Sequence, residues 1–267
     1  MAINAPETNA RARAASLKAV QPAPEMSATR VVVLAGGRGR RLEPYTSVLP
    51  KPLMPLGNRS ILEIMVERLA DAGLTDLTFC VGYLSHLIQA VFSNGPGDRV
   101  SIRYVKEDAP LGTAGPLRLI DGLDSTFLVM NGDLLTDISY NRLLQSHRAS
   151  GNVLTIATHE RMWKSDYGVL HLDSASDSPL RVTSYEEKPE LSLNVSMGIY
   201  VMDPETLEYI SSDGHFDFPE LVNALLADGQ PVGTFPHDGL WLDIGRQEDY
   251  ERAVQTWHDE TSEGAPL

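Results

Sequence analysis

The sequence predicts an α/β fold in which a mixed, mainly parallel sheet is flanked by helices, with a smaller, partly antiparallel second half. In the first half, short apolar runs alternate with stretches of helical periodicity, and this order is typical of parallel sheets. After about residue 152 the runs are shorter and fewer helices separate them. The predicted strands are 31–34, 77–81, 102–105 and 127–130, followed by 153–157, 168–172, 181–185 and 196–202, which we expect to extend the same sheet.

Two helices are marked by their ends and their apolar spacing. Ser60 and Glu63 form an S-x-x-E capping box before an apolar stretch that reaches Leu69, and Gly73 is the expected stop. Residues 84–92 place apolar side chains at i, i+3, i+4, i+7 and i+8, which predicts a second helix with one buried face.

The chain of 267 residues, 42% of them hydrophobic, is long enough to bury one large core. Residues 1–28 are rich in Ala, Pro, Ser and Asn without apolar periodicity, so we expect a mobile extension. Residues 29–257 should form the domain and 258–267 a C-terminal tail.

The charge balance argues against a nucleic-acid partner. The formal net charge is -14, and a phosphate backbone would be repelled by such a surface. The short basic stretch from Arg38 to Arg41 therefore indicates a local anion site for a small ligand. No apolar run approaches the roughly 20 residues of a membrane span, so a soluble, cytoplasmic protein without membrane contact is expected.

Few residues suit thiol or zinc chemistry. Cys80 is the only cysteine, which excludes an internal disulfide, and its apolar neighbours predict a buried, inert thiol. The seven histidines lack the spacing of metal ligands.

A glycine-rich turn follows the first predicted strand, at the sheet edge where α/β folds bind ligands. Its glycines would let backbone N–H groups approach phosphate oxygens, and Arg38, Arg40 and Arg41 would supply charge. The turn lacks the Walker A pattern, and Leu42 stands where a dinucleotide fingerprint has its third glycine. A nucleotide-phosphate cradle and a plain glycine turn with surface arginines both remain open from this segment alone.

The segment from Leu34 to Leu42, followed by Pro50-Lys51-Pro52, resembles the sugar-nucleotide pyrophosphorylase signature L-A-G-G-x-G-T-R-L…P-K-P. Arg40 stands where the family usually has Thr. The resemblance continues in order to about residue 254, at L-G-T-A-G (111–115), N-G-D (131–133), Y-G-V (167–169), E-K-P (187–189), M-G-I-Y (197–200) and W-L-D-I-G (241–245).

The resemblance implies a Rossmann-like, GT-A-type fold, Mg²⁺ as cofactor, and nucleotidyl transfer from a nucleoside triphosphate to a sugar 1-phosphate with release of pyrophosphate. It implies catalytic roles for Arg41 and Lys51, and metal binding by Asp133 and Asp243. Asp137 is a nearby alternative carboxylate, which we interpret as a turn residue. It also implies nucleotide binding by Leu34, Ala35, Gly36, Gly37, Gly39, Arg40, Gly112 and Asn131, and sugar-phosphate binding by Tyr167, Gly168, Glu187, Lys188 and Gly198.

The sequence favours GTP with a mannose- or heptose-type phosphate, because P-K-P-L-M-P-L-G resembles guanylyltransferases. UTP or dTTP with glucose 1-phosphate is the alternative, followed by a choline-phosphate cytidylyltransferase. A catalytically inactive nucleotide-sugar sensor belongs to a different class, and it should have lost a metal aspartate. A nicotinamide-dependent oxidoreductase is disfavoured by the missing glycine. A homo-oligomer is possible in this family.

Overall fold

The computed structural model describes residues 28–93, 99–173 and 181–262. The predicted N-terminal extension therefore lies, but for residue 28, outside the described residues. At the other end, helix α5 (Gln247–Ser262) continues past the predicted boundary at 257, so the first half of the expected C-terminal tail, residues 258–262, is helical.

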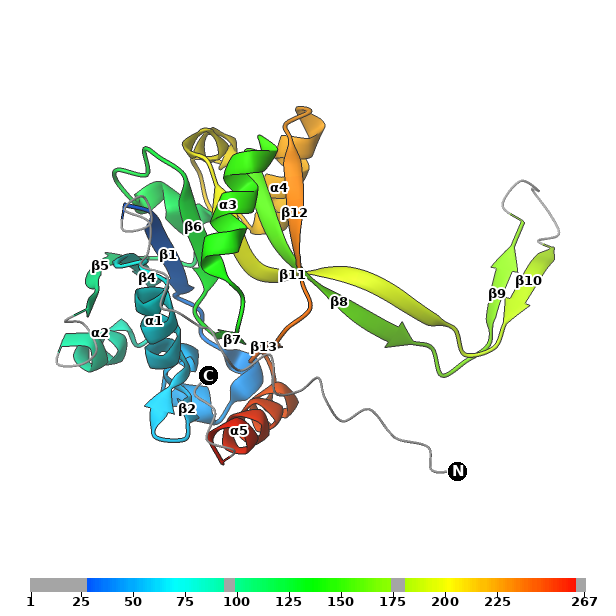
Figure 1. Ribbon diagram of the computed structural model, residues 1–267, viewed down its shortest axis with the longest axis horizontal. Helices are drawn as coiled ribbons and strands as arrows, with labels where there is room; N and C mark the ends of the chain where they lie inside the picture. The colour runs from blue at the N-terminus through cyan, green and yellow to red at the C-terminus, as the bar shows by residue number, and fades with distance from the viewer. Residues whose placement is uncertain (1–27, 94–98, 174–180, 263–267) are drawn as a thin grey trace, which may run out of the picture.

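The centre of the molecule is a seven-stranded sheet (Figure 1). Strands β1, β4, β5 and β6 are parallel, β11 runs antiparallel to both β6 and β8, and β12 pairs parallel with β8. This mixed, mainly parallel architecture confirms the predicted fold class. In sheet order the strands are β12 (Val232–His237), β8 (Leu154–Lys164), β11 (Glu190–Met202), β6 (Phe127–Asn131), β1 (Arg30–Ala35), β4 (Asp76–Val81) and β5 (Ser101–Lys106).

Helices cover both faces of this sheet, which explains why its central strands are apolar without alternation. Val31 and Val33 face one core, to which α1 (Ile61–Asp71), α2 (Ser85–Ser93) and α3 (Tyr140–Ser150) contribute. Val32 faces a second core with α4 (Phe218–Ala227). Helix α1 begins at the predicted capping box, in which the Ser60 side chain accepts from the Glu63 backbone N–H and Glu63 returns the bond to the Ser60 N–H.

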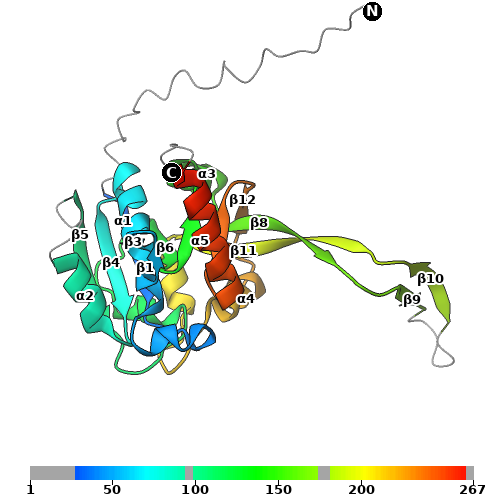
Figure 2. The ribbon, with the colours of Figure 1, turned by 90° about the horizontal axis from the view of Figure 1, so that it is seen from below.

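A third, smaller core lies below the sheet edge, where α5 packs against the loop that follows β1 (Figure 2). Leu42 and Trp257 meet in this core. Two short pairs of strands complete the body: β2 (Pro55–Leu56) with β3 (Arg59–Ser60), and β7 (Leu134–Thr136) with β13 (Trp241–Asp243).

The second half differs from the prediction that all its strands extend the main sheet. Beyond His159, β8 leaves the sheet together with the first part of β11, and the ribbon leads to a separate hairpin of β9 (Val169–Leu172) and β10 (Val182–Glu186). We call residues 160–173 and 181–196 the arm; both views show it projecting away from the body (Figures 1 and 2). The ribbon bends where the pairing of β11 shifts between Ser196 and Tyr200, around Gly198 at φ +73°.

Candidate active site

A cavity of about 470 Å³ opens at the carboxyl ends of β1 and β6. Open α/β sheets bind ligands at this edge because strand ends and loops converge there. Every residue predicted to bind nucleotide lines this cavity, together with Arg41, Lys51 and Asp133. Its full lining is Leu34, Ala35, Gly36, Gly37, Gly39, Arg40, Arg41, Lys51, Pro52, Glu107, Pro110, Gly112, Thr113, Pro116, Asn131, Asp133, His215 and Asp217.

The glycine loop is shaped by a tight turn and by close packing. Gly39 adopts φ +63°, a left-handed conformation that favours glycine, and its carbonyl accepts bonds from the Leu42 N–H at 2.9 Å and the Thr46 hydroxyl at 2.9 Å. A methyl group on Gly36 would lie 2.3 Å from Glu107 Oε1. The loop backbone can therefore lie close to a ligand, while Leu42 anchors it in the third core.

Lys51, Asp133 and Asp243 form a charged cluster at the cavity wall. Lys51 pairs with Asp133 Oδ2, and its Nζ lies 4.0 Å from Asp243 Oδ1. The two carboxylates meet because β13 pairs with β7, directly after Asp133, and the Ile244 N–H donates to the Asp133 carbonyl at 3.2 Å. The sequence separates them by more than a hundred residues, and the fold brings them together as the signature order predicts.

This cluster fits a hard divalent cation. Asp133 Oδ1 is buried and has no hydrogen-bond partner among the described residues, although a buried carboxylate oxygen normally has one. Burial, and next the nearby Asp133 charge, raise the pKa of Asp243. A cation bound by both carboxylates would use the unpartnered oxygen and relieve the repulsion between them.

Arg41 lies beside the same cluster. Its positive charge, like that of Lys51, acts to lower the pKa of Asp243 against the larger effect of burial. A methyl group on Gly245 would lie 3.5 Å from Arg41 Nη2 and 3.4 Å from Asp243 Oδ1, so the two side chains flank one glycine. Two cations and two carboxylates are thus concentrated at one wall of the cavity.

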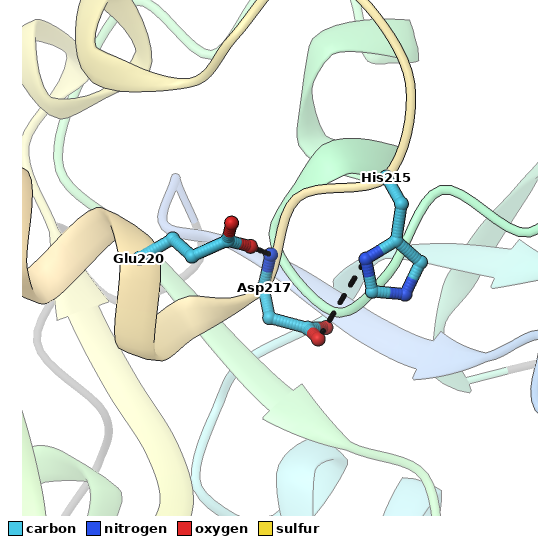
Figure 3. Close-up of side chains that lie close together, drawn as sticks. All are labelled: His215, Asp217 and Glu220. Carbon is cyan, nitrogen blue, oxygen red and sulfur yellow. Dashed lines mark hydrogen bonds and ion pairs between the residues drawn. The ribbon is translucent and has the colours of Figure 1, made fainter.

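The opposite end of the cavity holds residues that the sequence analysis missed. Thr113 donates to Asp217 Oδ1 from its backbone N–H at 2.8 Å and from its hydroxyl at 2.9 Å. His215 Nδ1 lies 3.7 Å from Asp217 Oδ2 (Figure 3). Asp217 is also the N-cap of α4, and its backbone N–H donates to Glu220 at 2.7 Å, so we assign these carboxylates to capping rather than to a metal. The D-x-x-E spacing before an apolar run was a usable signal for this helix start.

Glu107 is the second missed residue. It directly follows β5, at the same edge of the sheet as the glycine loop, and this position could have identified it. Its Oε2 accepts from the Leu111 N–H at 3.1 Å, and burial raises the pKa of its carboxyl group. The arrangement places a carboxylate against the glycine loop.

The predicted sugar-phosphate residues are divided between two places. Gly198 lies in the body, where a methyl group on it would be 2.4 Å from Asn131 Nδ2. Tyr167, Gly168, Glu187 and Lys188 instead lie on the arm, and both views place the end of the arm far from the body (Figures 1 and 2). These four residues do not line the cavity described above, because the ribbon of β8 and β11 carries them away from it. Their role in binding the sugar phosphate stays a prediction.

Comparison with known proteins identifies the family. The family described as "Nucleotidyl transferase" matches residues 30–260, which include the whole cavity and the arm. The chain belongs to the nucleotidyl transferase family. This member is 34% identical over 228 residues to a mannose-1-phosphate guanyltransferase of Aspergillus fumigatus, covering 83% of this chain. It is 31% identical over 250 residues to a UTP–glucose-1-phosphate uridylyltransferase of Synechocystis, covering 85% of this chain. The aligned region spans 62% of each of these two relatives.

Solved structures share the fold of this nucleotidyl transferase family member. The crystal structure of HddC from Yersinia pseudotuberculosis complexed with GMP-PN matches with a TM-score of 0.64 and 25% identity, covering 86% of this chain and 99% of that one. A putative glucose-1-phosphate thymidylyltransferase from Bacillus anthracis matches with a TM-score of 0.68 and 22% identity, covering 86% and 96%. Within the described residues, none of the helices combines the length and apolar character that crossing a membrane requires.

Proposed function

We propose that this chain transfers a guanylyl group from GTP to a mannose- or heptose-type sugar 1-phosphate. A phosphate oxygen of the sugar phosphate attacks the α-phosphorus of GTP, the bond between the α- and β-phosphates breaks, and pyrophosphate leaves. The observation that carries the proposal is the cluster of Lys51, Asp133 and Asp243 beside a glycine loop at the carboxyl edge of the sheet. The reaction needs no protein nucleophile, only neutralised charge and fixed geometry.

The charged residues have distinct parts in this reaction. Arg41 would hold the β- and γ-phosphates and stabilise the departing pyrophosphate, and Lys51 would neutralise charge around the α-phosphate. Asp133 and Asp243 would hold Mg²⁺, which would shield the triphosphate charge from the attacking anion. Both carboxylates are present, as an active transferase requires. An inactive sensor would be expected to have lost one of them.

Glu107 supports GTP over the other nucleotides. Guanine presents two adjacent donors on one edge, N1–H and the N2 amino group, and a carboxylate can accept both. Uracil and thymine present one N–H between two carbonyl oxygens, which a carboxylate would repel. Glu107 lines the cavity beside Gly36 of the glycine loop, and the relatives named as mannose-1-phosphate guanyltransferases add support for the sugar. The relative named as a uridylyltransferase keeps UTP with glucose 1-phosphate as the second candidate.

The test is pyrophosphate release with Mg²⁺, crossing GTP, UTP, dTTP, CTP and ATP against mannose, heptose and glucose 1-phosphates and choline phosphate. We expect release with GTP and one of the first two sugars. Release only with UTP or dTTP and glucose 1-phosphate would replace the base and sugar assignment. If a folded protein that still binds GTP releases no pyrophosphate with any of these substrate pairs, the inactive nucleotide-sugar sensor becomes the favoured function.

A further inference from the structure

A preorganised polar site lies on the arm where the ribbon of β8 and β11 meets the β9–β10 hairpin, and both views place this bend away from the described body of the chain (Figures 1 and 2). The Tyr185 hydroxyl donates a hydrogen bond to Glu187, and the Ser165 N–H donates to the Pro189 carbonyl at 3.0 Å. These two bonds hold the turn that joins β10 to β11. Lys188 lies in this turn at φ +47°, a strained conformation for a residue with a side chain. It is exposed and makes no ion pair with any residue that the structure describes. We call Tyr167, Gly168, Tyr185, Glu187 and Lys188 the elbow.

The arm also has an apolar face without a partner. Trp163 pairs with Leu191 across the ribbon, and their exposed fractions are 58% and 46%; Leu170 pairs with Tyr185 on the hairpin, at 53% and 61%. Nine of the fourteen large apolar side chains exposed in the described residues lie on the arm, between 162 and 193, and one of them, Met162, points to the opposite face of the ribbon from Trp163 and Leu191. An isolated two-stranded ribbon is marginally stable in water, so we expect another surface to cover the face of Trp163 and Leu191.

The cations that line the cavity are committed to one of the two anions of the proposed reaction. The lysine and arginines among the lining residues are Arg40, Arg41 and Lys51, and Lys51 is paired with Asp133. In the proposed function, Arg41, Lys51 and the Mg²⁺ held by Asp133 and Asp243 neutralise the triphosphate. The sugar phosphate, the second anion, therefore still needs a counter-charge of its own. The unpaired Lys188 on the arm has the complementary charge.

Contacts with the body hold the base of the arm so that the arm points away from the cavity of its own chain. β8 stays paired with β12 up to His159, Arg161 stacks over the Trp241 ring at 4.8 Å, and the Trp241 indole N–H donates to the Met197 carbonyl at 3.1 Å. Folding the arm back over its own cavity would break these contacts. A second chain can be reached without breaking any of them.

We infer that the arm of each chain inserts into the cavity of a second copy of this chain, forming a two-fold symmetric dimer whose sugar-phosphate sites are each built from two chains. In each site Lys188 and Glu187 from one chain bind the sugar phosphate beside Asp133 and Asp243 of the other. The exchange is reciprocal, so the assembly closes at two copies and both arms are covered. The sugar-phosphate role rests on the proposed function, whereas the dimer does not.

The activity test combines two inactive variants, Lys188→Ala and Asp133→Asn, carrying different affinity tags. Each variant alone should lose at least 99% of pyrophosphate release. Heterodimers isolated through both tags should regain about half the wild-type activity per dimer, because one of their two sites combines an intact cavity with an intact elbow. Heterodimers as inactive as their parents, beside an active wild type, would show that the arm acts within its own chain and would overturn the inference.

The assembly test needs no activity. Sedimentation should show the wild type as a dimer and Leu191→Glu as a monomer, because the charge interrupts the covered apolar face. Met162→Glu, on the opposite face of the same ribbon, is the matched control and should remain a dimer. A monomeric wild type would overturn the inference whether or not the protein is active, whereas an inactive dimer would contradict the proposed function alone.

Discussion

Glu107 is the residue on which the choice of nucleobase depends in this account. Glu107→Gln replaces an acceptor with a donor at the guanine edge, so kcat/KM for GTP should fall by about 10- to 100-fold, the equivalent of a lost bidentate base contact. The ratio of kcat/KM for GTP to that for UTP should fall with it. The matched control is Asp108→Asn, an exposed neighbour outside the main cavity, which should leave the ratio unchanged. An unchanged ratio in Glu107→Gln would remove Glu107 from base recognition.

Cys80 should be inert in the native protein. It is 1% exposed in the second core, and burial raises the pKa of its thiol from 9.0 to about 12, so at pH 8 only about one thiol in ten thousand is the reactive thiolate. Labelling with iodoacetamide at pH 8 should be negligible until the protein is unfolded in guanidinium. Because the folded state holds this proton more tightly, the thiol's contribution to stability should decrease as the pH rises from 9 towards 12. Rapid labelling without denaturant would contradict the burial.

At the scale of single elements, Gly198 sets the bend at which β11 leaves the sheet. Gly198→Ala should cost about 1–2 kcal/mol of stability because a side chain is strained at φ +73°, and it should also displace Asn131 from the cavity wall. Gly214→Ala has the same backbone strain at φ +76° but meets nothing within 4 Å. Thermal melts should therefore show similar losses for both variants, while pyrophosphate release should fall only in Gly198→Ala. Equal pyrophosphate release by the two variants would show that Gly198 does not contribute to the site.

The elements that the sequence predicted best are those whose signals are local. β1, β4 and β6 are largely buried and apolar, β5 carries the apolar residues Ile102, Tyr104 and Val105, and α1 has a complete capping box, so each was found within one or two residues. The arm was not foreseen, because its strands carry the same β propensity as sheet strands, and only long-range pairing decides which sheet a strand joins. α3, α4 and α5 were missed, although D-x-x-E marks the start of α4.

From the sequence, only those residues of the candidate site that lie in the family's signature motifs could be predicted. The order of the signatures predicted that Asp133 and Asp243 would meet, and the pairing of β7 with β13 accomplishes this. The same order also groups Lys188 with the site, but Lys188 does not line the cavity, because motif order says nothing of where an extended ribbon carries a residue. Glu107 and Asp217 belong to no motif considered from the sequence, and their position at the cavity is known only from the structure.

At the scale of the whole molecule, the body should fold without the arm. The three cores draw their buried side chains from outside residues 160–196. Replacing residues 162–192 by an Asn-Gly turn, which joins Arg161 to its pairing partner Leu193, should shift the melting temperature by only a few degrees. Pyrophosphate release should be lost and the protein should sediment as a monomer. A truncated chain that does not fold would show that the cores depend on the arm.

The most direct test of the central claim, nucleotidyl transfer at the Lys51–Asp133–Asp243 cluster, is product formation from GTP, Mg²⁺ and mannose 1-phosphate or a heptose 1-phosphate, followed by mass spectrometry. The wild type should form the GDP-sugar, and Asp133→Asn should form it at least about 100-fold more slowly with an unchanged melting temperature. Asp137→Asn removes a carboxylate only four residues away and should retain near-wild-type activity. Full activity in Asp133→Asn, or equal losses in both variants, would contradict the account.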